Sequence, residues 1–190
     1  MVRVTEAVGY FKPEWFTEWV LKVGKAEANR TSKKALKIGT RIDEIIRSGI
    51  YEANKKDTKE VKKCLQNFLS WKSRNGAATI IPLSRIDNES IGLTGCADLY
   101  WEEKEDLIDF KSSKRISPEM FFQLGGYKRL GFKAKRLAIL ICDKEEDMFD
   151  YKTNEDYGLS LDQCVDAFES AYKHYKYYTY IKQQIGDENA

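Results

Sequence analysis

The sequence predicts an α/β fold in which a mixed β-sheet is flanked by helices. Residues 1–75 carry apolar side chains at helical spacing, and residues 159–185 return to that spacing. Between them, residues 77–153 contain short runs of β-branched and apolar residues separated by polar turns, which is typical of strands. Helical segments on both sides of several short strands indicate a sheet covered by helices.

The chain has 190 residues, which is enough for one domain with a substantial core, and neither a low-complexity linker nor an internal repeat divides it. We therefore expect a single domain over residues 1–190. Ser117 followed by Pro118 is a strong start signal for a helix. The expected parts are a helical lead-in at 1–75, a sheet-containing core at 77–153 that includes a helix at 117–131, and a C-terminal helix at 159–185.

Composition excludes several classes of protein. Hydrophobic residues make up 42% and charged residues 33% of the chain, which argues against disorder. No stretch approaches the roughly 20 apolar residues of a membrane span, and the start lacks the features of a signal peptide. We expect a cytoplasmic protein, in the host cytoplasm if it is viral, without a membrane partner. The four cysteines form no CxxC pair, so a zinc or iron–sulfur site is not expected.

Two aspartates interrupt the apolar runs in "GCADLYWEEKEDLIDFKSS", residues 95–113. If Glu102–Glu105 form a four-residue hairpin loop, Trp101 faces Asp106, and Asp98 then lies opposite Asp109. Like charges opposed on a sheet repel, and a bound Mg²⁺ or Mn²⁺ would offset that repulsion. The alternative, an exposed polar hairpin with both carboxylates in water, stays open at this point.

Lys111 favours the metal site because side chains two residues apart on a strand share a face. Its ammonium group would lie beside Asp109, where it can position a metal-bound water or stabilise charge on a phosphate. Gln123 and Tyr127, four residues apart on the next helix, also share a face and can reach phosphates or hold Lys111. Gly125 and Gly126 between them predict a close approach, for which helix packing is the favoured explanation.

In their order, these residues resemble the PD-(D/E)xK nuclease superfamily, and within it the RecB-like exonuclease branch. The matching elements are Gly95 with Asp98, Asp109 with Lys111, and Gln123 with Tyr127. The segment "VTEAVGYF…W…VGKAEANRTSKKALKIGTRIDEII" is similar to the helical lead-in of that branch, so the resemblance spans roughly residues 2–142. It implies a restriction-endonuclease-like core.

The resemblance also implies roles. Asp98, Asp109 and the backbone carbonyl of Phe110 would bind the metal, and Lys111 would help to generate the attacking hydroxide, with Gln123 and Tyr127 orienting the lysine or the phosphate. The branch usually has a histidine ligand where this chain has Asp43, and aspartate is also a suitable ligand for magnesium. Iron–sulfur relatives carry a cysteine trio near the C-terminus, whereas this chain has only Cys164 there.

Basic residues on both sides of the expected centre are candidates for binding a phosphate backbone. A solvated surface is the alternative for each basic run. The residues predicted to contact substrate are Arg41, Ser112, Lys114, Arg115 and Lys128.

The tail "AYKHYKYYTYIK" interleaves aromatic and basic side chains, as single-strand grooves do. Packing onto the core is the alternative for some of these rings.

We therefore expect a Mg²⁺- or Mn²⁺-dependent DNA exonuclease that acts on single strands or duplex ends in recombination, repair or phage DNA processing. The alternatives are an endonuclease of the same fold and a nucleic-acid-binding subunit without turnover, which the aspartate at position 43 favours. A homo-oligomer or a recombination partner protein also remains open.

Overall fold

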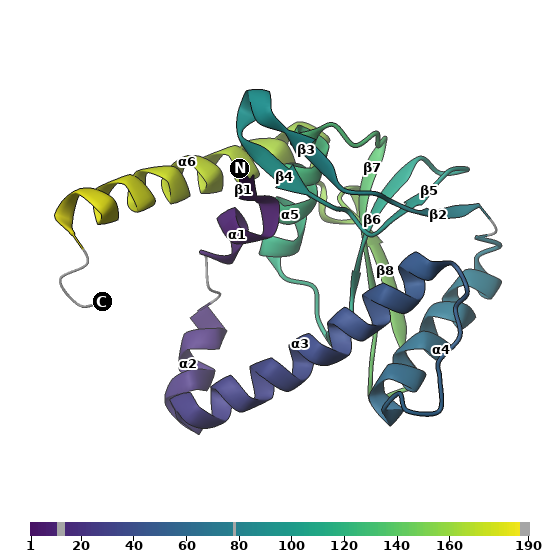
Figure 1. Ribbon diagram of the computed structural model, residues 1–190. Helices are drawn as coiled ribbons and strands as arrows, with labels where there is room; N and C mark the ends of the chain where they lie inside the picture. Colours follow the sequence, from purple (N-terminus) through teal and green to yellow (C-terminus); the bar gives the residue numbers. More distant parts are fainter. Residues whose placement is uncertain (11–13, 78, 187–190) are drawn as a thin grey trace.

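The computed structural model describes residues 1–10, 14–77 and 79–186 and contains a mixed five-stranded sheet with helices on both faces (Figure 1). The strand order is β2-β5-β6-β7-β8, in which β6 and β7 are parallel and the other neighbours are antiparallel. A second sheet has the order β1-β4-β3. The α/β class and the mixed sheet predicted from the sequence are therefore confirmed.

The helices are α1 (Val4–Gly9), α2 (Glu14–Val23), α3 (Lys25–Ser48), α4 (Lys59–Arg74), α5 (Pro118–Leu130) and α6 (Leu161–Ile185), with short 3-10 turns at Glu89–Ile91 and Glu155–Tyr157. The strands of the large sheet are β2 (Ile80–Pro82), β5 (Leu99–Trp101), β6 (Asp106–Lys111), β7 (Arg136–Cys142) and β8 (Phe149–Thr153). Those of the small sheet are β1 (Val2–Arg3), β3 (Ile86–Asn88) and β4 (Leu93–Gly95).

Alternation along β6 divides the core into two layers. Leu107 lies in an apolar cluster with side chains of α1, α5 and α6, whereas Ile108 belongs to a second cluster with side chains of α3 and α4. Successive strand residues point to opposite faces, so each face of the sheet has its own helical cover. Asp109 and Lys111 therefore point toward the α5 side of the sheet.

The segment of residues 90–101 contains two strands that belong to different sheets. It breaks at Cys96–Asp98, so Gly95 ends β4 in the small sheet and Asp98 directly precedes β5 in the large one. The short helix α1 lies inside the expected helical lead-in, although six residues are too few to show a clear helical period of their own. In the described part of the chain, the helices are too short or too polar to cross a membrane.

Candidate metal centre

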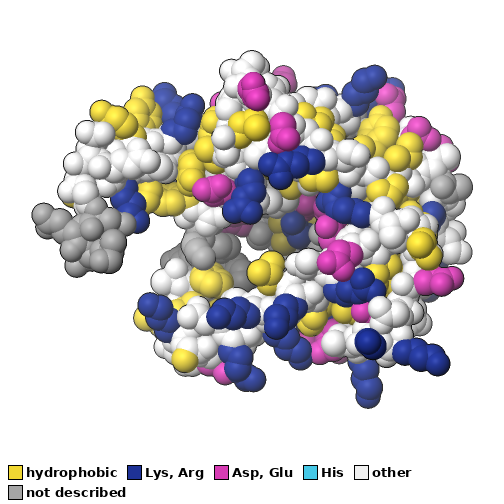
Figure 2. All heavy atoms as spheres, in the orientation of Figure 1, with side chains coloured by type: hydrophobic (Ala, Val, Ile, Leu, Met, Phe, Trp, Pro, Cys, Tyr) yellow, Lys and Arg dark blue, Asp and Glu magenta, His cyan; other side chains and the backbone are white. Residues whose placement is uncertain are grey.

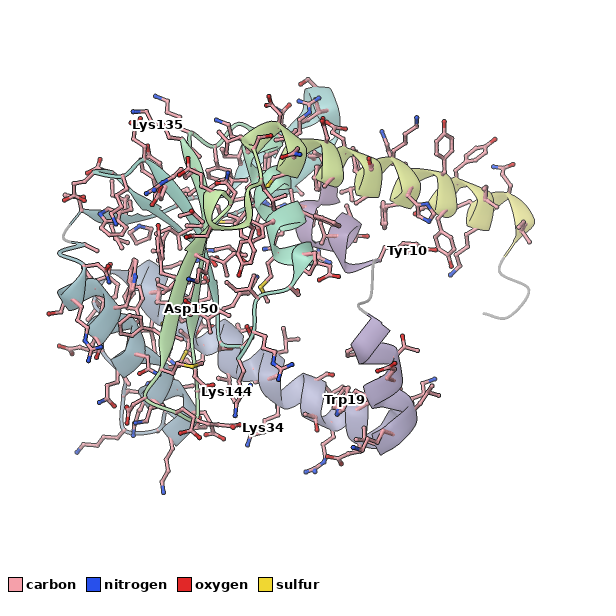
Figure 3. All side chains as sticks on the ribbon, turned by 180° about the vertical axis from the view of Figure 1, so that it is seen from behind. Tyr10, Trp19, Lys34, Lys135, Lys144 and Asp150 are labelled. Carbon is pink, nitrogen blue, oxygen red and sulfur yellow. The ribbon has the colours of Figure 1, made fainter. Side chains whose placement is uncertain are left out.

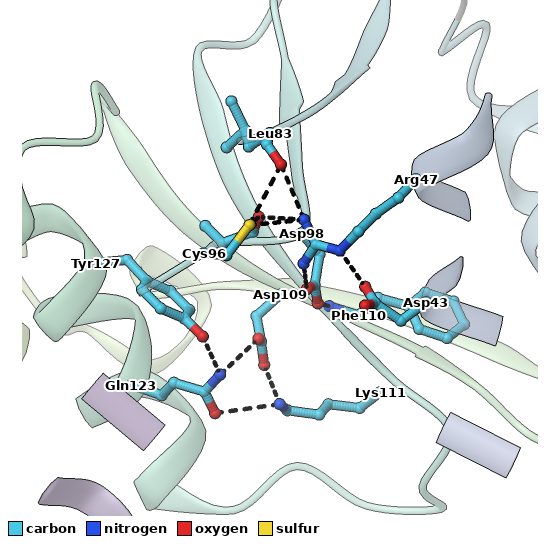
Figure 4. Close-up of polar contacts among 11 residues, drawn as sticks. Asp43, Arg47, Leu83, Cys96, Asp98, Asp109, Phe110, Lys111, Gln123 and Tyr127 are labelled. Carbon is cyan, nitrogen blue, oxygen red and sulfur yellow. Dashed lines mark hydrogen bonds and ion pairs between the residues drawn. The ribbon is translucent and has the colours of Figure 1, made fainter. Parts of the chain in front are cut away.

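The hairpin register places the two predicted aspartates opposite each other. Trp101 pairs with Asp106 across the turn, and Leu99 pairs with Ile108. One rung further along, Asp98 faces Asp109, as the four-residue loop predicts. The backbone N–H of Phe110 donates a hydrogen bond of 2.7 Å to Oδ2 of Asp98 (Figure 4). The backbone of β6 therefore fixes the direction of the Asp98 carboxylate.

Burial opposes the ionisation of both carboxylates. The side chain of Asp98 is 16% exposed and that of Asp109 is 1% exposed. Burial, and then the charge of Asp109, raises the pKa of Asp98. Burial also raises the pKa of Asp109, although the nearby charge of Lys111 counteracts part of that rise. Because both carboxylates are largely buried, the structure excludes the alternative in which an exposed hairpin points them into water.

Lys111 supplies one positive charge and is held in place from two sides. Its Nζ lies 2.6 Å from Oδ2 of Asp109 and donates a hydrogen bond of 3.1 Å to Oε1 of Gln123. Burial opposes the charge of this amine, but the carboxylates of Asp109 and Asp98 outweigh burial and raise the pKa of Lys111. Lys111 is therefore an ammonium ion at neutral pH, suited to stabilising negative charge rather than to taking a proton.

Gln123 links the lysine, the carboxylate and the helix. Its Nε2 donates to Oδ1 of Asp109 at 3.0 Å and to Oη of Tyr127 at 2.8 Å (Figure 4). Burial raises the pKa of Tyr127 well above its usual value, so its hydroxyl stays protonated. Of the two roles predicted for Gln123 and Tyr127, holding Lys111 is the one that these contacts support.

Glycines let α5 pack closely against its neighbours. A Cβ on Gly125 would lie 2.0 Å from the carbonyl oxygen of Cys164 in α6, and one on Gly126 would lie 2.6 Å from the ring of Phe168. A Cβ on Gly95 would lie 3.0 Å from the Tyr127 ring. Helix packing, the favoured explanation for Gly125 and Gly126, is therefore confirmed, and Gly95 leaves room for Tyr127.

Asp43 reaches the centre through a residue that the sequence did not single out. Oδ1 of Asp43 accepts a hydrogen bond of 2.7 Å from Nε of Arg47, one turn further along α3. Nη2 of the same guanidinium donates to Oδ1 of Asp98 at 2.8 Å (Figure 4). The i, i+4 spacing of Asp43 and Arg47 was the available sequence signal. Arg47 and Asp98 are 51 positions apart, so no local sequence pattern predicts the hydrogen bond between them.

The residues predicted to bind substrate have other partners. Arg41 makes two hydrogen bonds to Asp57, at 2.7 and 3.2 Å, and a third to Glu44. Lys114 pairs with Glu145 at 2.7 Å, and Nζ of Lys128 donates to the carbonyl of Ala134 at 3.2 Å.

The remaining two lie on the segment after β6. Oγ of Ser112 lies 3.8 Å from the place that a Cβ on Gly39 would occupy, which puts it beside α3, and Arg115 is exposed. The hydrogen bonds and ion pairs of the centre do not include Arg41, Ser112, Lys114, Arg115 or Lys128. Their role in substrate binding stays a prediction.

The donor atoms suit a hard divalent cation. Two carboxylates face each other, and the buried Oδ2 of Asp109 makes its ion pair but accepts no well-directed hydrogen bond from the described residues. Because the N–H and C=O of a strand residue point the same way, the carbonyl of Phe110 lies on the Asp98 side of β6. Oxygen ligands of this kind bind Mg²⁺ and Mn²⁺. Asp98, Asp109 and the Phe110 carbonyl therefore fit such an ion.

A third carboxylate does not join them in the present arrangement. Across residues 1–10, 14–77 and 79–186, no three His, Cys, Asp or Glu side chains converge on one point as metal ligands would. Asp43 is turned to the guanidinium of Arg47, which lies between it and Asp98. Direct metal binding by Asp43 stays a prediction.

No model of a known protein family matches the chain, and no curated protein matches it either.

Proposed function

We propose that the protein is a metal-dependent deoxyribonuclease, an exonuclease acting on DNA ends in recombination, repair or phage DNA processing. The single observation that supports this most is the opposed pair Asp98 and Asp109 with the Lys111 ammonium ion beside it. The order GxxD, DxK and QxxxY on strand, strand and helix adds the resemblance to the RecB-like branch.

Each side chain of the centre has a role in phosphodiester hydrolysis. A bound Mg²⁺ or Mn²⁺ would polarise the phosphate and lower the pKa of the attacking water. Lys111, held by Gln123 and Asp109, directs an ammonium group at the negative charge that develops on the phosphate. Tyr127 fixes Gln123 through a hydrogen bond. This arrangement needs no histidine base.

The surface offers contacts for a nucleic acid. Figure 2 shows a hollow beside α3 with Lys and Arg side chains along its edges. Lys34 of α3 and Lys144 of the turn after β7 lie at the same end of the molecule and line one cavity of about 350 Å³, in which Lys34 pairs with Glu60 at 2.8 Å (Figure 3). On α6, Tyr177 and Tyr180 are each 60% exposed and lie beside Lys173 and Lys176. Exposed rings between lysines are suited to stacking with the bases of a single strand.

A second candidate function is a nucleic-acid-binding subunit that does not cleave. The observation that favours it is Arg47, which occupies one oxygen of Asp98 and takes Asp43 away from a metal. An endonuclease of the same fold is the other alternative, because the centre itself does not distinguish ends from internal bonds.

Cleavage assays separate these functions. Purified protein is incubated with labelled DNA, either linear with end labels or circular, and either single- or double-stranded. Each reaction contains Mg²⁺, Mn²⁺ or EDTA, and the variants Asp109→Ala and Lys111→Ala are assayed in parallel. We expect loss of linear DNA only, no cleavage in EDTA, and a loss of at least about a thousandfold in either variant, since metal and charge stabilisation contribute several kcal/mol.

Cleavage of circles would identify an endonuclease. Binding to DNA without cleavage in any metal would favour the binding subunit. If Asp109→Ala cleaved at the wild-type rate, the proposed centre would be wrong.

A further inference from the structure

The guanidinium of Arg47 is surrounded by acceptors from three parts of the chain (Figure 4). Beyond its bonds to Asp43 and Asp98, Nη1 donates to the carbonyl oxygens of Leu83 at 2.9 Å and Ala97 at 3.3 Å and lies 2.8 Å from Sγ of Cys96. All three nitrogens have partners within the protein. Arg47 is therefore committed to this position and is not available to a phosphate.

The acceptors around Arg47 are chemically those of a cation site. Two carboxylate oxygens and two backbone carbonyl oxygens surround the group. Hard divalent cations take the same kinds of ligand. Asp98 belongs both to these acceptors and to the proposed metal position between Asp98 and Asp109. The guanidinium of Arg47 therefore lies next to that metal position.

The local charge also favours a single added ion. Asp43, Asp98 and Asp109 supply three carboxylates, and Arg47 and Lys111 supply two positive groups. The net charge of these five groups is slightly negative. One divalent ion makes it slightly positive, and a second ion would make it strongly positive. A charge of that size in a partly buried site is costly.

We infer that Arg47 is a positioning residue whose guanidinium takes the place of a second cation and limits the centre to one divalent ion. The inference depends on the proposed function, because it assumes that Asp98 and Asp109 bind metal. If Arg47 only fastens α3 to the sheet, its removal lowers stability and leaves the number of bound ions unchanged.

The test counts bound Mn²⁺ per chain, by calorimetry and by electron paramagnetic resonance, on protein stripped of metal. We expect one Mn²⁺ in the wild type, two in Arg47→Gln, and one again in the double variant Asp43→Asn/Arg47→Gln, which lacks a ligand of the emptied position. Arg41→Gln is the matched control, since it removes an arginine from the same helix that pairs with Asp57 instead. It should keep one ion, as should Arg47→Lys, which retains the charge.

Two ions in the wild type, or one ion in a folded Arg47→Gln variant, would overturn the inference while leaving the proposed metal centre in place. Should Arg47→Gln fail to fold, the wild-type count decides between one ion and two. Absence of Mn²⁺ binding in the wild type, or unchanged binding in Asp109→Ala, would refute the metal centre and the inference with it.

Discussion

Two aspartates of β6 are buried almost completely, yet their surroundings differ. Asp106 receives hydrogen bonds of 2.8 Å from both Nε and Nη2 of Arg136 and another from the hydroxyl of Tyr151. Asp109, three residues further on, has an ammonium ion and an amide as partners but also faces Asp98. Burial of an acid therefore does not define a functional site. The distinguishing feature of Asp109 is a second carboxylate, that of Asp98, facing it across the hairpin.

Stability should separate the two aspartates most strongly. Asp106→Asn removes the carboxylate that accepts two hydrogen bonds from Arg136, and breaking a buried pair in this way costs about 3–5 kcal/mol. Asp109→Asn removes one of two repelling charges, so we expect its free energy of unfolding to stay within about 1 kcal/mol of the wild type. Urea unfolding in EDTA measures both. An equal loss in both variants would mean that Asp109 is a structural residue like Asp106.

The partner on α5 should affect activity and leave stability nearly unchanged. Gln123→Leu removes an acceptor from Lys111 and a donor from Asp109, so we expect kcat/KM to fall about 10- to 100-fold, or roughly 1.4–2.7 kcal/mol. Initial rates on labelled linear DNA measure this effect. The control is Gln66→Leu, at an exposed glutamine of α4, which should cleave at the wild-type rate. Wild-type kinetics in Gln123→Leu would mean that Lys111 needs no positioning.

The smallest expected difference, between the wild type and Asp109→Asn, is in the pH dependence of stability without metal. Asp98 and Asp109 have raised pKa values in the folded protein, so the folded state binds more protons between about pH 4 and those raised values. Their contribution to stability therefore falls as the pH rises through that window, by at most about 1.4 kcal/mol per pH unit for each proton. Asp109→Asn should flatten this decline in urea unfolding at several pH values in EDTA.

Other carboxylates act with the opposite sign and cancel in the comparison of wild type and variant. The hydrogen bond from Lys34 lowers the pKa of Glu60 to about 2, so its contribution is present above about pH 4.5 and is lost as the pH falls below that. A variant whose decline matched the wild type would contradict the repulsion between Asp98 and Asp109.

The sequence predicted those parts of the centre that local rules determine. Strand alternation and a four-residue loop were sufficient to oppose Asp98 and Asp109, and helical spacing placed Gln123 beside Tyr127. Helical spacing also indicated the helical lead-in that contains α3 and α4.

The sequence did not predict contacts between distant segments. Arg47 reaches Leu83 and Ala97 because α3 packs beside β2, and that packing depends on the whole fold. Arg41 has the charge of a phosphate-binding residue, yet Asp57 and Glu44 already pair with it. A run of basic residues does not show which of them are already neutralised.

The hydrogen bond from the Phe110 amide to Asp98 has a consequence for side-chain length. A main-chain donor cannot move without displacing β6, so a glutamate at position 98 would have to fold back on itself or lose this bond. The carboxylate at position 109 has only side chains as partners, and those can shift by the length of one methylene. The main-chain bond therefore restricts the position before β5 to the shorter acid, a restriction that the side-chain partners of position 109 do not impose.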